Sequence, residues 1–350
     1  MANAPPLSPD ALDDLVQTTL PLFKKGKWTD ISMDKQNYCS QDMIKTMGVE
    51  ERGGTQLSFR VQVKNMGNAR NTDMYAEDIT KVEDIMVTGT VPWRKQTVNF
   101  SYDIDEPEFQ SDPETIIKEL MIRQHSAMND MSELQETNLW SLPSGANDNR
   151  PFGIPYWYVK DPTTTPTGGL NGGNPAGFTG GCAGISSTDY PQYSNWTFGY
   201  TSYTLDDLVA RLKRSIAMTN FEAPNRHPEL GYGEAKYKIY TTYRVQEPLE
   251  AIAETRNENL GADVARYMDA VTVGRVPMKW VSYLENNDTS DPLYGISWKD
   301  FRPFTKKGRN MRRNPPKAAA RQHSVREVHY DNWMNYANYN RRTGFVGNIA

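Results

Sequence analysis

Residues 111 to 140 contain the strongest secondary-structure signal in this chain and limit what the remainder can fold into. Ser111 and Asp112 can accept hydrogen bonds from the amides of a first helical turn, and Pro113 suits the first position inside it. Apolar side chains then recur at helical spacing, at Ile116, Ile117, Leu120, Ala127, Met128, Met131 and Leu134. A Leu-Pro-Ser-Gly sequence at 142–145 ends the pattern. We therefore predict one helix, roughly 40 Å long at about 1.5 Å per residue, with an apolar face.

Such a helix is also compatible with an α/β enzyme, so the composition of the chain matters. At 350 residues the chain can form two domains or one large one. Its two cysteines, Cys39 and Cys182, provide no disulfide framework and favour a reducing compartment. It has no apolar run of about 18 residues and no signal-peptide pattern, so we expect neither a membrane nor a secreted protein.

The formal net charge of −4 argues against a dedicated nucleic-acid binder. The mean hydropathy is −0.71, and the chain contains 22 prolines and 25 glycines. A compact enzyme usually has a larger aliphatic fraction. This composition favours a loop-rich protein that buries surface against copies of itself.

Residues 51–104 predict a long hairpin. An apolar face alternates with polar residues in the first strand, and its members are Leu57, Phe59, Val61 and Val63. A second extended run covers 85–104 and changes parity between Lys95 and Thr97, which predicts a β-bulge there. Because Pro92 cannot donate to a ladder, this strand should lie at an edge or outside the main sheet. The twenty polar residues between the runs predict a projecting hairpin that rests on another part of the protein.

The region after the long helix mixes helix and strand without a regular βαβ period, which predicts an α+β fold. Residues 161–203 are rich in Gly, Thr, Ser and Asn and predict an ordered surface loop; no phosphate-binding motif is present. Beyond it we expect a helix capped by Thr204, a strand at 237–245, a helix opened by Pro248 and an extended run at 271–284.

The last sixty residues contain a basic window without an acidic residue. Its cations are Arg302, Lys306, Lys307, Arg309, Arg312, Arg313, Lys317, Arg321 and Arg326, and an acidic cluster lies at 103–114, just before the long helix. Three interpretations stay open: ion pairing between neighbouring subunits, which we prefer, contact with nucleic acid, and a solvated loop. The candidate contact residues are Arg309, Arg312, Arg313 and Lys317.

The motifs of several common enzyme classes are missing. His323 and His329 are six residues apart without a Cys/His set, and HExxH, GxSxG and GxGxxG do not occur. We therefore nominate no catalytic residue, no cofactor and no metal site, and we expect a protein that is not an enzyme.

The order of arm, projecting hairpin, long helix, α+β body and terminal strand resembles the major capsid proteins of tailed double-stranded DNA bacteriophages. Residues 293–301 (LYGISWKDF) and 340–346 (NRRTGFV) are also similar to such sequences. The resemblance implies the Hong Kong 97-type capsid fold. Its parts would be an N-terminal arm at 1–50, an extended loop at 51–104, a peripheral domain with the spine helix at 105–150, an axial domain at 151–270, a return to the peripheral domain at 271–340 and a C-terminal strand at 341–350.

The resemblance further implies that copies of the chain form hexamers and pentamers of an icosahedral shell around viral double-stranded DNA. The apolar face of the hairpin would then be buried only on assembly. The implied partners are a separate scaffold protein, because we expect no scaffolding segment before the arm, a portal and a possible decoration protein; the location is the virion, after assembly in the host cytoplasm. Lys64 with Asn335, Asn338 or Asn340 is a candidate pair for a covalent cross-link between subunits.

Three alternatives remain. A cellular encapsulin-like compartment would share the fold, but would contain an enzyme cargo. A carbohydrate-active enzyme built on residues 161–203 would need paired carboxylates at a cleft. A tail or decoration protein of the same virus is the third.

Overall fold

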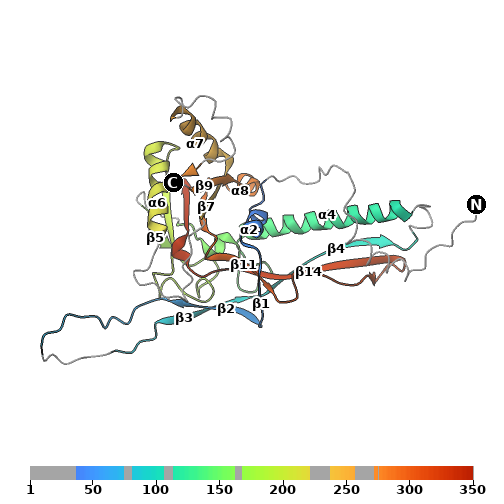
Figure 1. The fold of residues 1–350 in the computed structure, drawn as a ribbon, viewed down its shortest axis with the longest axis horizontal. Coiled ribbons are helices and arrows are strands. Elements are labelled where there is room, and N and C mark those ends of the chain that lie inside the picture. Colours follow the sequence, from blue (N-terminus) through green and yellow to red (C-terminus); the bar gives the residue numbers. More distant parts are fainter. Residues whose placement is uncertain are drawn as a thin grey trace, which may run out of the picture.

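The computed structural model describes residues 37–74, 81–105, 113–161, 168–220, 237–256, 272–274 and 276–349, with the side chains of 113–118 and 253–256 excepted. These residues form two mixed sheets, helices packed on them and a two-stranded hairpin that projects from the body (Figure 1). This is the α+β class that the sequence predicts. The short helix expected near residues 8–20 lies outside the described residues.

The six-stranded sheet is built around its long strand β14 (Val325–Asn338). This strand pairs antiparallel with β4 (Arg94–Asp103), and the two run together below the long helix α4 (Figure 1). The other strands are β11 (Phe301–Lys306), β12 (Arg312–Arg313) and β13 (Lys317–Ala318), which pair with β14, and β1 (Glu50–Arg52), which lies parallel to β11 at the edge.

The helix α4 (Pro113–Trp140) confirms the long helix predicted from the sequence. Leu120 and Ala127 pack against Phe100 and Val328 of the sheet beneath them. The predicted face is wrong near the C-terminal end: Leu134 is 39% exposed, whereas Gln135 and Glu136 are buried. The buried face changes because this end of α4 leaves the sheet and contacts the helices α2 (Cys39–Met47), α5 (Ile154–Trp157) and α8 (Ser282–Asn287).

The seven-stranded sheet contains the C-terminal strand near its middle. Its order is β5 (Gly169–Gly172), β6 (Asn195–Tyr200), β15 (Phe345–Ile349), β10 (Leu293–Ser297), β7 (Tyr237–Thr241), β9 (Val276–Trp280) and β8 (Thr272–Val273). Strands β8 to β10 therefore belong to this sheet, and the chain returns to the six-stranded sheet only between β10 and β11. Because β7 pairs with both β9 and β10, the seven-stranded sheet continues past residue 271, where the resemblance implies a return to the peripheral domain.

The helices next to this sheet do not begin as predicted. A π-helical turn (Leu205–Val209) leads into α6 (Ala210–Thr219), and the side chain of Thr204 makes no capping bond. The strand predicted at 237–245 ends at Thr241, because α7 (Tyr243–Arg256) begins there and contains Pro248 in its interior. The run at 271–284 likewise ends in α8.

The hairpin consists of β2 (Gln56–Gln62) and β3 (Met86–Pro92), which pair only with each other among the described strands. Pro92 closes β3, so its missing donor disrupts no sheet. The predicted bulge at 95–97 is wrong. The run at 85–104 is two strands in two different sheets, and the chain passes from β3 to β4 at the buried Trp93.

Residues 168–203 contain both exposed and fully buried positions and include the strands β5 and β6, so the surface loop predicted for 161–203 is only partly right in its described part. Cys182, Ile185, Phe198 and Tyr200 are all completely or almost completely buried. Gly181 has φ of +80°, and a Cβ atom there would overlap the carbonyl oxygen of Ile185. The glycines in this segment thus allow close backbone packing.

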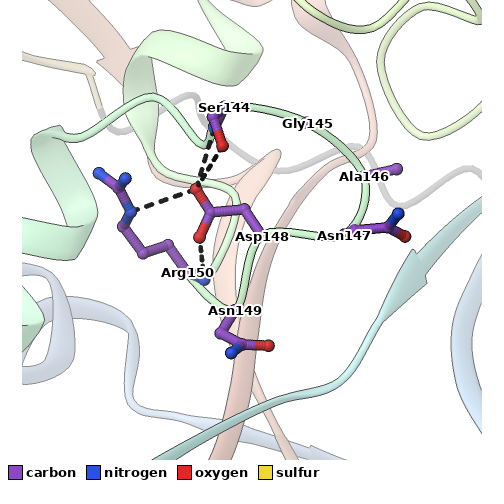
Figure 2. Close-up of a pocket in the computed structure, with 7 residues that line it drawn as sticks. All are labelled: Ser144, Gly145, Ala146, Asn147, Asp148, Asn149 and Arg150. Atoms are coloured by element: carbon purple, nitrogen blue, oxygen red, sulfur yellow. Dashed lines mark hydrogen bonds and ion pairs between the residues drawn. The ribbon is translucent and has the colours of Figure 1, made fainter.

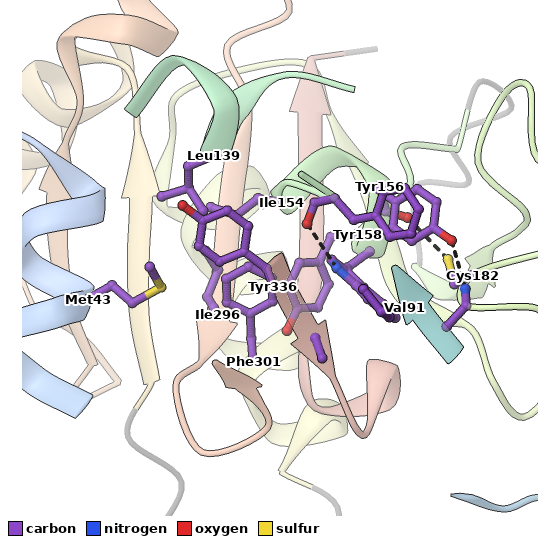
Figure 3. Close-up of a cluster of buried hydrophobic side chains, with 14 of the residues drawn as sticks. Met43, Val91, Leu139, Ile154, Tyr156, Tyr158, Cys182, Ile296, Phe301 and Tyr336 are labelled. Atoms are coloured by element: carbon purple, nitrogen blue, oxygen red, sulfur yellow. Dashed lines mark hydrogen bonds between the residues drawn. The ribbon is translucent and has the colours of Figure 1, made fainter. Parts of the chain in front are cut away.

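The main core lies where all parts of the fold meet. Figure 3 shows side chains from α2, α4, β3, β10, β11 and β14 in this cluster, together with Tyr156, Tyr158 and Cys182. Helix α2, which belongs to the predicted N-terminal arm, contributes Cys39 and Met43. The hairpin, the long helix and both sheets are therefore joined by one hydrophobic core.

Candidate assembly surfaces

The strands of the hairpin pack on the chain's own core. Leu57, Phe59 and Val63 are 4%, 7% and 6% exposed, and Val61 is half-buried. The ring of Phe59 lies 5.3 Å from Tyr339 and 6.4 Å from Trp157, measured between centroids. The expectation that this apolar face is buried only on assembly is therefore wrong. The sequence showed the face, but not what covers it.

The end of the hairpin, in contrast to its strands, is fully exposed to solvent. We call residues 64–74 and 81–84 the distal hairpin; every one of them is exposed. Lys64 forms an ion pair with Glu83 (2.8 Å), and Asn68 exchanges two hydrogen bonds with the backbone of Lys81. Glu83 raises the pKa of Lys64. These contacts hold the two sides together, and Figure 1 shows the loop reaching far from the body.

Large apolar side chains on the distal hairpin point into solvent. Met66 is 43% exposed, Met74 82% and Val82 92%. A polar loop that also presents such side chains is typical of an interaction surface.

The basic window folds into a turn and two short strands. Lys306 to Arg309 form a β-turn in which Arg309 N donates to Lys306 O (2.9 Å), and Gly308 has the positive φ (+69°) that a type II turn needs at its third position. Arg312 pairs in register with Asp331, and Arg313 with Tyr330. Lys317 pairs with Glu327 in the next strand along.

The four candidate cations do not share one face. Side chains paired across an antiparallel ladder lie on the same side of the sheet. Tyr330 packs in the cluster beneath α4, so Arg313 lies on that side, whereas Arg312 and Lys317 lie on the other. Arg309 is in the exposed turn.

The described part of the acidic cluster lies beside the basic window of the same chain. Ile104 N donates to Ser324 O (2.9 Å), and Ser324 Oγ donates to Asp103 (3.2 Å). In addition, Lys95 forms an ion pair with Asp331 (3.1 Å). The described end of the acidic cluster is therefore hydrogen-bonded to the basic window of its own chain. Residues 106–112 lie outside the described residues.

A buried carboxylate attaches α2 to the long helix, and sequence analysis missed it. Glu136 of α4 is 1% exposed and accepts from Cys39 N (3.1 Å), Ser40 N (2.7 Å) and Trp140 Nε1 (2.7 Å). Glu136 thus satisfies amides at the N-terminus of α2.

The other side of α2 is bound to the seven-stranded sheet. Asp42 accepts from Lys238 Nζ (2.9 Å) and Tyr240 OH (2.6 Å). Burial opposes ionisation of Asp42, but these hydrogen bonds and the charge of Lys238 prevail and lower its pKa. Helix α2 therefore joins α4 to β7.

A second missed residue is Arg341, which is completely buried. Its guanidinium donates to the carbonyls of Trp157 (2.7 Å), Tyr193 (2.8 Å) and Gly173 (2.9 Å), and to the side-chain oxygen of Asn195 (3.0 Å). It connects the C-terminal turn to the Gly-rich segment. The motif at 340–346 is therefore a packing element.

Two of the three candidate cross-linking asparagines are inaccessible. Asn335 and Asn338 are completely buried, and Asn335 donates to Pro92 O (2.7 Å) and accepts from Phe152 N (2.7 Å). Asn340 accepts from Arg342 N. Lys64, at the surface of the hairpin, is engaged by Glu83. This arrangement disfavours the cross-link.

The loop at 144–150 lines a shallow depression (Figure 2). Asp148 accepts from Ser144 N (3.0 Å) and Arg150 N (3.1 Å), and these backbone bonds lower its pKa to about 2. Figure 2 shows the Asp148 carboxylate turned toward its own loop. The carboxylate oxygens of Asp148 therefore stabilise the turn at 144–150.

The described residues contain no group of three or more His, Cys, Asp or Glu side chains suited to a metal ion. Among them, too, no helix has the length and apolar character needed to cross a membrane. The His329 Nε2 atom lies 3.2 Å from a carboxylate oxygen of Glu327. Burial raises the pKa of the Cys182 thiol to about 11.

Solved structures with a similar fold were found, although no protein-family model and no curated sequence matches this chain. The capsid asymmetric unit of cyanophage A-1(L) matches with a TM-score of 0.58 and 12% identity, over 93% of this chain and 96% of that one. The capsid of a native GTA particle matches with a TM-score of 0.55 and 10% identity, over 93% of this chain and 96% of that one. The capsid of Myoviridae phage XM1 matches with a TM-score of 0.54 and 8% identity, over 95% of this chain and 98% of that one. The chain therefore has the Hong Kong 97-type fold of these capsid proteins, as the sequence predicts.

Proposed function

We propose that this chain is the major capsid protein of a tailed double-stranded DNA bacteriophage. Copies of it assemble as hexamers and pentamers into an icosahedral shell that encloses the genome. The observation that carries the proposal is a fold shared with phage capsid chains over nearly the whole length of both proteins. Its role is structural and not enzymatic.

Exposed features of the single chain support this proposal. The distal hairpin presents Met66, Met74 and Val82 to solvent, at a distance from any core of its own. Exposed apolar side chains on a projecting loop are typical of an interaction surface, and in a shell a neighbouring subunit would cover them.

The proposal includes further partners and a location. The protein would reside in the virion after assembly in the host cytoplasm, with a separate scaffold protein, a portal and a possible decoration protein. Its exposed cations, such as Arg321, would contact the DNA through phosphates and without sequence preference.

The test is to express the chain alone and with the candidate scaffold protein of its virus, and to measure size by sedimentation and electron microscopy. We expect closed uniform shells, or pentamers and hexamers. A stable monomer or dimer under both conditions would refute the proposal. Shells that enclose a specific enzyme instead of DNA would assign the chain to a cellular compartment.

A further inference from the structure

We propose that a cradle of buried residues at the base of strand β3 fixes the direction in which the hairpin leaves its own subunit. The cradle is defined as the turn at 181–185 of the Gly-rich segment together with Trp93 and Asn335. This inference rests on the proposed function and deepens it, because the direction of the hairpin determines where a neighbouring subunit can meet it.

Strand β3 has one edge paired with β2 and one free edge. Val63 N donates to Ile85 O (3.0 Å), and along an antiparallel pair the backbone groups point toward the partner at alternate positions. The odd-numbered residues of β3 therefore face β2. Thr88, Thr90 and Pro92 direct their backbone groups away from it. This free edge is where the body of the subunit can hold the hairpin.

Two hydrogen bonds from different parts of the body hold the free edge at the base of the hairpin. Thr90 N donates to Ala183 O (2.9 Å) of the Gly-rich segment. Pro92 O accepts from Asn335 Nδ2 (2.7 Å) of β14. Two successive outward-facing positions of β3 are thus bound to separate elements, and two such bonds define an angle as well as a contact.

Trp93 closes the base of the hairpin. Its side chain is buried, and Nε1 donates to Gly54 O (3.1 Å). The residue that leads out of β3 is thereby bound to the turn that leads into β2. Apolar packing, such as that of Phe59 on Tyr339, is not directional, so it attaches the hairpin without fixing its angle. The hydrogen bonds of the cradle supply that angle.

The turn at 181–185 has an unusual backbone. Ala183 is buried and has φ of +55°, a conformation that residues with a Cβ atom rarely adopt. Gly181 and Gly184 also have positive φ, at +80° and +82°. Ala183 N donates to Tyr156 OH (2.7 Å), and Figure 3 shows the Tyr156 ring next to Cys182 of this turn. A strained residue whose carbonyl meets the hairpin indicates a positioning role.

Asn335 uses both ends of its amide and is completely buried. Its Oδ1 accepts from Phe152 N (2.7 Å) and Tyr336 N (2.8 Å). These bonds orient Nδ2 toward Pro92 O. Asn335 is thus a positioning residue, because it acts on a neighbouring subunit only through the hairpin.

The test measures the direction of the hairpin in the unassembled subunit. Spin labels on Met66→Cys of the distal hairpin and Lys213→Cys of α6 report the distance between hairpin and body by double electron–electron resonance. The native Cys39 and Cys182 are buried and should take no label. We expect one narrow distance distribution. A broad distribution in this chain would overturn the inference, since the direction would then be set by neighbours.

Thr90→Pro removes the donor to Ala183 O, and Thr88→Pro is its matched control. Both side chains are exposed and both amides point to the free edge, but among the described residues only the Thr90 amide donates a hydrogen bond. Proline is tolerated at such edge positions. Thr90→Pro should shift the mean distance by about 5 Å or more, one spacing between neighbouring strands. Its unfolding midpoint should match that of the control. Equal distances in the two variants would contradict the proposal.

Asn335→Asp tests the second bond and decides alone if Thr90→Pro does not fold. The carboxylate still accepts from Phe152 N and Tyr336 N. It has no proton for Pro92 O at about pH 9, where the group ionises even when burial raises its pKa. We expect a similar shift in distance there and its reversal at about pH 5, where a protonated carboxyl can donate again. An unshifted distance at both pH values would count against the cradle.

The consequence for assembly is measured separately. Thr90→Pro should lower the yield of closed shells about tenfold or more, because a contact that was preorganised is lost, whereas Thr88→Pro should assemble normally. Normal shells from a Thr90→Pro chain with a shifted distance would overturn the inference. If the wild type forms no shells although the distance shift is found, the capsid proposal fails and the cradle stands.

Discussion

The buried Arg341 and the exposed pair Lys307 and Arg309 show two different uses of positive charge in this chain. Arg341 has no exposed surface, and carbonyl oxygens and one amide oxygen surround its guanidinium. Lys307 and Arg309 are exposed, and no carboxylate pairs with them within the described residues. The hydrogen-bond acceptors of Arg341 all belong to its own chain, whereas Lys307 and Arg309 are open to contacts with other molecules.

The difference separates residues that stabilise the subunit from residues that are free to join subunits. A buried charge remains in place only when its donors are satisfied, so removing it damages the fold. An exposed cation cluster adds little to stability, because water and salt screen it. The same division runs through the hairpin, where Phe59 packs on the core and Met74 is open to solvent.

The largest effect is expected for Arg341→Met. The variant leaves several buried carbonyls without a donor, and we expect a loss of roughly 3 to 5 kcal/mol in the free energy of unfolding. Urea unfolding of the unassembled subunit, followed by tryptophan fluorescence, measures it. Arg321→Met, at an exposed position, should stay within about 0.5 kcal/mol of the wild type. Equal losses in the two variants would remove the distinction between buried and exposed cations.

Phe59→Ala tests the same division within the hairpin. Since Phe59 is 7% exposed and contacts Trp157 and Tyr339, we expect a loss of about 3 kcal/mol in the unassembled subunit. Met74→Ala should change subunit stability by less than about 0.5 kcal/mol. If Phe59→Ala unfolds like the wild type while its shells fail, the apolar face contributes to assembly and not to the subunit's core.

Glu136→Gln examines a buried anion instead of a cation. An amide can accept fewer of the three hydrogen bonds from Cys39 N, Ser40 N and Trp140 Nε1, so we expect a loss of about 2 kcal/mol. Asp130→Asn, at an exposed position on the same helix, is the matched control and should be neutral. Hydrogen exchange of the α2 amides should rise only in the first variant; unchanged exchange would show that α2 does not depend on Glu136.

Asp42→Asn should have the smallest effect on stability, and this effect should depend on pH. Its pKa is lowered in the folded chain, so its ionised form contributes stability above the ordinary carboxyl range, near pH 4, and this contribution is lost as pH falls through the folded pKa. We expect Asp42→Asn to be less stable than the wild type by about 1 kcal/mol at neutral pH. The gap should narrow on acidification. A gap that stays constant down to pH 2 would exclude this ionisation as its cause.

The long helix and the hairpin were predictable because their signals are local. Helical spacing after Pro113 and strict alternation from Leu57 to Val63 are each contained within one segment. The errors arose where a partner from elsewhere decides burial. Leu134 is exposed and Glu136 buried because α2 lies against that end of α4.

The sequence by itself determined the α+β class, the order of the elements and the location of the basic window, since these follow from periodicity and composition. Only the tertiary structure decided that the apolar hairpin face rests on the chain's own core, that Cys182 and Ile185 of the Gly-rich segment are interior and that Arg341 holds the C-terminal turn. Burial of those residues depends on contacts between segments that are separate in the sequence, and a local pattern carries no information on which other segment will cover it.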